Sequence, residues 1–406
     1  MEFLFIDGEQ ICIYKDGEVK EYKSGYIEKY KQKTFQSVKN NEWRKKSRTE
    51  MLLNEDFYPD FDDGEFSIKL NSAWFLENEN EILYAFTVND NSGIYRKYLD
   101  DEKIQDAHIV YSNQLEFTNI FYENNNLIAS VKKGEVAGDI AIFSKDLADY
   151  KFVTGGDSLD ENPYLHTDGK IYFNSYGVAR DEVGNCLGYG GSEIFSLDLK
   201  TMEVEEILSS EKYSLVKPIP WRDGFLMITK PINDKEKSNV LLDILMIPVR
   251  ILQGIVGFIS AFVTFFSGKP LVSDNSPSSN GYTKTKKMNK DEKKIFISNQ
   301  LVNIDKEMKK NKKDEYPSFI PKSWKLIHVK ENEKENVLTK TFLSSIVDYC
   351  LIEENKIIAT NGKFIFLIVQ EEKSWTSQVI FETNCCLKVF PIPKTKDSTQ
   401  DLYSLL

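Results

Sequence analysis

The chain has 406 residues, of which 41% are hydrophobic and 13% aromatic, and its formal net charge at pH 7 is −11. That length and apolar content allow a large core, and the acidic balance argues against nucleic-acid binding, which needs a basic face. The five cysteines are odd in number, two are adjacent and none forms a CxxC pair, so both a secreted disulfide framework and a zinc site are disfavoured.

The chain begins with short strands separated by tight turns. Residues 3–22 contain three β-rich runs joined at Asp7-Gly8 and Asp16-Gly17, and Asp-Gly between such runs is a strong hairpin signal. Since no basic region precedes Asp7, we expect a strand rather than a signal peptide, and therefore a cytoplasmic location. Residues 26–48 are helix-prone and basic, which favours an amphipathic surface helix.

A repeat follows in the first half of the chain. A glycine, a short β-rich run and a turn recur at Gly93, Gly138 and Gly191, at intervals of 45 and 53 residues. Each phrase belongs to a unit with four predicted strands, and the three units span residues 67–112, 115–156 and 159–209. A four-stranded unit recurring at this period is typical of a β-propeller blade.

The second half continues the pattern with one interruption. A unit begins at 213–230, is broken by about 90 residues and resumes at 324–342, and a further unit spans 345–383. Residues 386–390 form one strand without partners of its own. Joining it to residues 3–22 completes a sixth blade and leaves no long exposed edge. We therefore predict an all-β, six-bladed β-propeller closed by its N- and C-terminal strands, with a mostly helical insertion. The predicted domains are the first part of the propeller at 1–234, the insertion at 235–322 and the last part of the propeller at 323–406.

Residues 159–208 resemble the TolB-like (WD-repeat-like) β-propeller repeat. The resemblance rests on Pro163, on Thr167-Asp168-Gly169-Lys170 before Ile171-Tyr172-Phe173, and on the strand 194–199. The chain departs from the family pattern where His166-Thr167 replaces Ser-Pro, and the match is weaker over 67–156. The resemblance implies a six-bladed fold and carries no particular chemistry.

The insertion contains a long apolar segment at 239–272. Residues 251–266 carry no charge, and as a helix these 16 residues extend about 24 Å, short of a typical membrane core. Small or polar residues recur every seven positions, which is typical of an amphipathic helix. We predict that this face contacts a membrane surface or a partner protein, or that it packs on the propeller. Its contact residues are Leu241, Leu245, Ile251, Ile255, Phe258, Phe262, Phe265 and Phe266.

A lysine-rich tract follows the apolar segment. Its lysines outnumber its acidic residues in an otherwise acidic chain, and an anionic membrane surface would attract them. A solvated linker is the alternative interpretation. The predicted basic patch comprises Lys284, Lys286, Lys287, Lys290, Lys293 and Lys294.

Catalytic signals are sparse. The three histidines, His108, His166 and His328, lie in separate units, and spacing alone supports neither a metal cluster nor a nucleophile–histidine pair. The glycine-rich stretch 177–191 lacks a phosphate-binding pattern and is interpreted as a rim loop, with Arg180 and Asp181 as its candidate binding residues. Three tryptophans, Trp74, Trp221 and Trp324, are interpreted as packing residues between blades.

The sequence therefore predicts a non-catalytic propeller scaffold that binds unidentified protein partners. It needs no cofactor or metal, does not bind nucleic acid, and reaches a membrane surface or a membrane-associated complex through 239–272. The alternative is an enzyme of the hydrolase or lactonase type, or a small-ligand binder, that uses the central funnel. That alternative requires polar groups converging at one mouth, and Asp168, Asp223 and Glu353 lie near comparable turns.

Overall fold

The computed structural model divides the chain into two compact units. Unit 1 comprises Met1–Pro231 and Lys293–Leu406, and unit 2 comprises Ile232–Glu292. The structure describes residues 1–33, 68–76, 80–88, 91–99, 106–123, 125–134, 136–184, 186–232, 294–297, 300–330, 340–371 and 374–392. Nearly all of unit 2, including the predicted apolar contact face, therefore lies outside the described residues.

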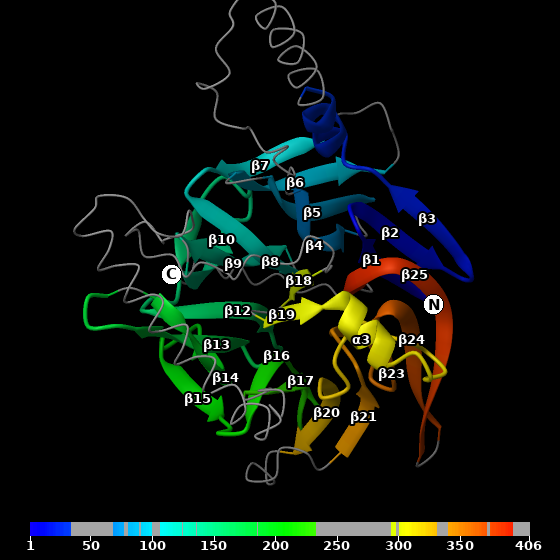
Figure 1. Cartoon of the computed structure of the whole chain (residues 1–406). Helices are drawn as coiled ribbons and strands as arrows, with labels where there is room; N and C mark the ends of the chain where they lie inside the picture. The colour runs from blue at the N-terminus through cyan, green and yellow to red at the C-terminus, as the bar shows by residue number, and fades with distance from the viewer. Residues whose placement is uncertain are drawn as a thin grey trace, which may run out of the picture. The chain divides into compact units, whose positions relative to one another are not determined.

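Three consecutive antiparallel sets of four strands form the first half of unit 1, and they coincide with the three predicted repeats (Figure 1). A single parallel contact between Gly138 and Leu159 joins the second set to the third. The first set is β4 (Ile68–Leu76), β5 (Glu81–Val88), β6 (Asn91–Tyr98) and β7 (Ala107–Ser112). The second is β8 (Leu115–Glu123), β9 (Asn126–Lys133), β10 (Ala137–Phe143) and β11 (Tyr150–Phe152). The third is β12 (Ser158–Leu165), β13 (Lys170–Arg180), β14 (Cys186–Asp198) and β15 (Val204–Leu208).

The fourth set bridges the insertion, because its second strand pairs with a strand about 100 residues later. It contains β16 (Tyr213–Trp221), β17 (Gly224–Pro231), β20 (Lys325–Lys330) and β21 (Lys340–Ser344). The backbone of Gly224 lies so close to Val329 and Lys330 that a Cβ would clash with both. This close approach explains a glycine at the start of β17.

The last sheet contains both ends of the described chain. Strand β25 (Ser374–Pro391) pairs with β24 (Gly362–Glu371) through its first part and with β1 (Glu2–Asp7) through its last part. The Asp7 carboxylate accepts hydrogen bonds from the Asn384 and Cys385 backbone amides at 3.1 and 2.6 Å, so it fixes the point where β25 passes from one partner to the other. The remaining strands are β22 (Asp348–Glu353), β23 (Lys356–Thr360), β2 (Gln10–Lys15) and β3 (Glu18–Tyr22).

Buried side chains come from both faces of the middle strands. In β5, for example, every residue from Glu81 to Phe86 is buried, as expected for strands that pack against a sheet on either side. Around the cavity described below, the nearest strands are β4, β8, β12, β16, β22 and the end of β25. These are the first strands of their sets, together with the strand that pairs with β1.

The predicted mostly helical insertion at 235–322 is not supported in its described part. Residues 294–303 instead form a two-stranded hairpin of β18 (Lys294–Ile297) and β19 (Gln300–Asn303), followed by the seven-residue helix α3 (Ile304–Lys310). The short apolar runs 295–297 and 301–302 favour strands, and the Asn303 side chain caps α3 by accepting from the Lys306 amide at 2.9 Å.

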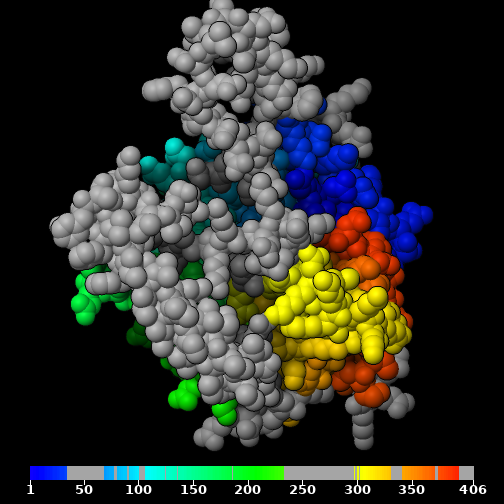
Figure 2. All heavy atoms as spheres, viewed as in Figure 1, coloured from blue at the N-terminus to red at the C-terminus, as the bar shows by residue number. Residues whose placement is uncertain are grey.

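This hairpin and helix belong to unit 1 and pack on its last sheet. Phe319, Ile320 and Trp324 are buried in a cluster with Val347, and Figure 2 shows this part of the chain, in yellow, directly against the orange and red strands. Gly362 has a φ of 89°, and a Cβ at this position would clash with the Phe319 ring. Residues 319–324 therefore pack as part of unit 1.

The described helices of the chain are short. The predicted helix over 26–48 is observed as a helix at 25–33, and residues 34–48 lie outside the described residues. Among the described residues, none of the helices has the length and apolar character needed to cross a membrane.

Candidate functional site

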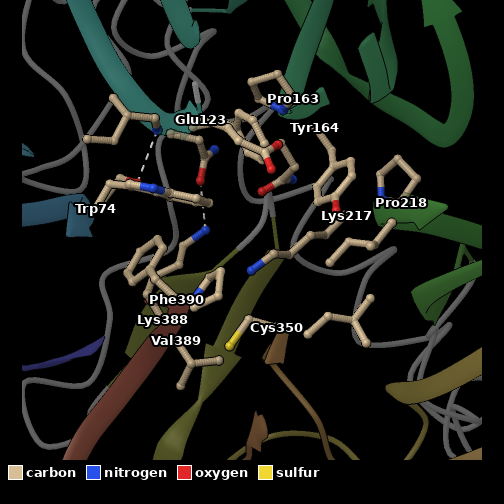
Figure 3. A pocket seen from close by; sticks show the side chains of 18 of the residues that line it. Trp74, Glu123, Pro163, Tyr164, Lys217, Pro218, Cys350, Lys388, Val389 and Phe390 are labelled. Carbon is tan, nitrogen blue, oxygen red and sulfur yellow. Dashed lines mark hydrogen bonds between the residues drawn. The ribbon is translucent and has the colours of Figure 1, made fainter. Parts of the chain in front are cut away.

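A cavity of about 310 Å³ lies where six strands of unit 1 meet. Its walls come from β4, β8, β12, β16, β22 and the end of β25, and Figure 3 shows side chains of the residues that line it. We call this space the axial cavity. A volume of this size lies at the lower end of the range for small-molecule sites.

The same backbone irregularity shapes two walls of the axial cavity. Asn162-Pro163 in β12 and Lys217-Pro218 in β16 fall at equivalent breaks in strand pairing. Asn162 and Lys217 have φ values of 54° and 55°, a left-handed conformation that non-glycine residues adopt infrequently. Proline is tolerated at a bulge because strand pairing is already interrupted there. The bulges turn both side chains toward the cavity.

Asn174 in β13 holds both bulges in place. Its Oδ1 accepts a hydrogen bond from Asn162 Nδ2 at 2.8 Å and another from the Lys217 backbone amide at 3.0 Å. Its own Nδ2 donates to Ser192 Oγ at 3.1 Å, and Asn174 is fully buried. A buried amide with its polar atoms satisfied fixes geometry well, so Asn174 is a positioning residue for Lys217.

An ion pair links three of the six cavity strands. Asp348 at the start of β22 accepts a hydrogen bond from Lys217 Nζ at 2.7 Å through Oδ1 and another from the Val389 amide at 2.8 Å through Oδ2. The Asp348 side chain is 3% exposed and that of Lys217 is 18% exposed. The pair is therefore largely desolvated, and it neutralises the Lys217 ammonium.

A second lysine enters the axial cavity from β25. Lys388 Nζ donates to Asn119 Oδ1 on β8 at 2.9 Å, and no carboxylate of a described residue lies within the 4.0 Å of an ion pair from it. Burial lowers the pKa of Lys388, and the charge of Asp348 opposes that effect. Figure 3 shows the Lys388 and Lys217 side chains ending in the same space.

Aromatic rings form the apolar side of the cavity. The ring centroid of Trp74 lies 4.9 Å from that of Phe121 and 6.4 Å from that of Phe390. Tyr164 lies edge-on to Phe121 at 5.1 Å, and burial raises the pKa of Tyr164 to about 12. Of the tryptophans interpreted as packing residues, Trp74 thus packs between strands and also lines the axial cavity.

A second group of buried charges lies outside the lining of the axial cavity. Lys230, near the end of β17, is 1% exposed, and its ammonium has no hydrogen-bond partner among the described residues. It lies 4.0 Å from the centre of the Trp324 ring, a cation–π contact. Burial lowers the pKa of Lys230 to about 7, and burial raises that of nearby Glu161. The Trp324 ring therefore packs over the Lys230 ammonium group.

The predicted rim residues have structural partners. Arg180 donates two hydrogen bonds to the Asp157 carboxylate at 2.5 and 2.6 Å and one to the Gly184 carbonyl at 2.9 Å. Asp181 accepts from the Val183 amide at 3.0 Å. Both residues hold the long β13–β14 hairpin together, and neither reaches the axial cavity.

The carboxylates proposed for a funnel enzyme do not converge on the axial cavity. Asp168 accepts from Tyr172 and from the Lys170 amide, Asp223 pairs with Lys330 at 3.2 Å, and Glu353 pairs with Lys356 at 2.7 Å. Asp168 and Glu353 are held within their own turns, Asp223 is held by a lysine of the neighbouring strand β20, and none of the three lines the cavity. In the part of the chain that the structure describes, no group of three histidine, cysteine or acidic residues is arranged to hold a metal ion.

The structure also shows the positions of the three histidines and of Lys294, the last lysine of the predicted basic patch. His108 lies on β7, His166 lies 3.2 Å from Asp168, and His328 is buried beside Trp221. They remain in separate strand sets, as predicted. Lys294 begins β18, and the other five lysines of the predicted basic patch lie outside the described residues.

Sequence reasoning missed Lys217, Lys388 and Asp348. Each lysine interrupts an apolar strand, in Leu215-Val216-Lys217-Pro218-Ile219 and in Leu387-Lys388-Val389-Phe390. A charged residue inside an otherwise apolar strand is rarely buried without a purpose. These lysines, together with Asn162-Pro163 and Lys217-Pro218, could have indicated the cavity from the sequence alone.

No protein-family model and no curated protein matches this sequence. Among solved structures, TolB from Acinetobacter baumannii matches with a TM-score of 0.46 and 8% identity, over 96% of this chain and 66% of that chain. A putative TolB from Agrobacterium tumefaciens matches with a TM-score of 0.33 and 14% identity, over 58% of this chain and 73% of that one. The tricorn protease matches with a TM-score of 0.40 and 12% identity, over 94% of this chain and 35% of its own.

The chain thus spans about two thirds or less of several of these larger proteins. The consecutive antiparallel sets of four strands agree with the β-propeller resemblance carried by residues 159–208, and TolB proteins are among the structures to which the chain is similar. At these identities the likeness concerns the fold alone, and a protease and a prolyl oligopeptidase are among the matches.

Proposed function

We propose that the six four-stranded arrays are the blades of a closed propeller, and that this propeller binds a small ligand in its axial cavity. The observation that carries the proposal is the cavity of about 310 Å³ with two lysine side chains ending inside it. Burying charged groups is costly unless they are paired or used. A ligand in the cavity would accept hydrogen bonds from these ammonium groups, which apolar packing cannot do.

Binding, rather than chemistry on the ligand, suits the way the polar groups are held. Asn119, Asn174 and Asp348 each bridge two strands through short hydrogen bonds. Groups fixed in this way orient a ligand at little entropic cost. The site is therefore proposed as a preformed receptor for a small molecule.

The test fills the cavity. Ile352 lines it, and Ile352→Trp places a large ring in the space, whereas Val204→Trp adds the same ring at a residue that is 52% exposed. A fragment library is screened by ligand-observed NMR against both variants. We expect hits on the unmodified protein and on Val204→Trp that are lost with Ile352→Trp. Hits unaffected by Ile352→Trp would contradict an axial site.

A second proposed function rests on the apolar segment 239–272 and the lysines behind it. In this proposal the propeller is a scaffold that the insertion attaches to an anionic membrane surface or to a partner protein. Deleting residues 239–292 leaves the packed hairpin at 294–303 in place. We expect the intact chain to sediment with phosphatidylserine vesicles at low salt and the deletion variant to stay in the supernatant. Equal sedimentation of the two would exclude this attachment.

A further inference from the structure

The axial cavity holds one lysine, Lys388, that forms no ion pair with a described residue, although Asp348 and Glu161 lie near enough to act on its charge. Lys217 and Lys388 both end in the cavity, but only Lys217 has a carboxylate partner, Asp348 at 2.7 Å. Lys388 donates to the neutral amide oxygen of Asn119. An ammonium group has three donors, so Lys388 keeps donors for a further acceptor.

The apolar wall lies beside this ammonium. Phe390 is two residues from Lys388 on β25, so both side chains lie on the same face of that strand. Trp74 and Phe121 continue the wall from β4 and β8. One cation next to an aromatic wall is complementary to a molecule with one negative charge and one flat apolar group.

We infer that the axial cavity binds an aromatic monocarboxylate, with its carboxylate on Lys388 and its ring against Trp74, Phe121 and Phe390. This inference rests on the proposed function and names the ligand class of that site. A dianion such as phosphate fits less well, because Asp348 and Glu123 lie close to the same space and would repel a second negative charge. The small volume also favours a single-ring ligand over a nucleotide.

The experiment compares two ligands that differ only in charge. Phenylacetate and its neutral analogue phenylacetamide are titrated against the full chain by NMR or calorimetry, and inorganic phosphate is added as a competitor. A hydrogen bond to a charged group is worth about 1.5–3 kcal/mol. We therefore expect phenylacetate to bind about 10- to 100-fold more tightly than phenylacetamide, and phosphate not to displace it.

Variants assign the charge preference to one residue. Lys388→Met should remove the preference without weakening phenylacetamide, and Lys388→Arg should restore most of it. Trp74→Leu should weaken both ligands. Lys356 lies at the start of β23 and its side chain is about one-third exposed, so Lys356→Met is the matched control and should change the binding of neither ligand. Circular dichroism and unfolding midpoints check that each variant is folded, and Lys388→Gln replaces Lys388→Met should the latter fail to fold.

Each outcome separates the two claims. A charge preference that disappears in Lys388→Met supports the inference. Equal binding of the acid and the amide, or displacement by phosphate, overturns the ligand class but leaves small-ligand binding in the cavity standing. A screen in which no fragment binds to the cavity overturns both.

Discussion

Asp348 is predicted to contribute strongly to stability through its partners on two other strands. Substituting Asp348→Ala leaves the Lys217 ammonium without its counter-ion in a nearly dry site, and it leaves the Val389 amide without an acceptor. Breaking a buried ion pair by removing one partner costs about 3–5 kcal/mol. We expect Asp348→Ala to lower the free energy of unfolding by that amount, measured by equilibrium urea unfolding with tryptophan fluorescence and circular dichroism.

A double-mutant cycle separates the pair from the rest of the site. Adding Lys217→Met removes the orphaned charge, so the double variant should recover part of the loss, with a coupling energy of about 2 kcal/mol or more. Glu353 and Lys356 provide the control, since their ion pair is also 2.7 Å long on the same sheet but is about one-third exposed. Its coupling should stay below about 1 kcal/mol. Equal coupling for the two pairs would refute the argument from burial.

Three further predictions follow from single sites. Gly362→Ala should lower the melting temperature, because its φ of 89° is strained for alanine and the new Cβ meets the Phe319 ring, and Phe319→Leu should relieve part of the loss. Cys186 is the exposed cysteine, and burial raises the pKa of the other four thiols, so a thiol reagent should label the native chain once and Cys186→Ser should abolish that labelling. The pKa of Lys230, lowered by burial to about 7, means that from about pH 7 to 10 the unfolded chain binds a proton that the folded chain does not. Stability should therefore rise with pH in that window by up to about 1.4 kcal/mol per unit, and Lys230→Met should remove the slope, whereas the same slope in both proteins would contradict burial as the cause.

The strand sets were predictable because their signals are local. Asp168-Gly169 marks the turn between β12 and β13, and Gly169 has a φ of 84°, which only glycine adopts easily. The sequence links the strand at 386–390 to the strands at 3–22, because neither group alone has the four strands of a complete unit. The pairing of β1 with β25 is the arrangement that this count requires.

The rest depended on contacts between residues far apart in sequence. The lysine-rich composition around residues 284–313 concealed the hairpin at 294–303, which is stabilised by the packing of Phe319 and Trp324 on a sheet formed by later residues. Lys217 and Asp348 are 131 residues apart, and Lys388 and Asn119 are 269 apart. Local pattern cannot pair such residues, so the axial cavity became visible only in three dimensions.

The position of the cavity explains how this fold can carry a specific site on strands that also hold the sheets together. Of the strands that line the cavity, β4, β8, β16 and β22 lie at the edges of their sheets, so the bulge at Lys217 on β16 disturbs one ladder and leaves the rest of its sheet paired. Because the cavity is lined by side chains from several strands, one lining side chain can change while the strand pairing stays the same. The ligand preference of such a site can therefore change while the propeller itself stays the same. The interactions that resist such change are those that cross between arrays, and in this chain they are centred on Asn174 and Asp348.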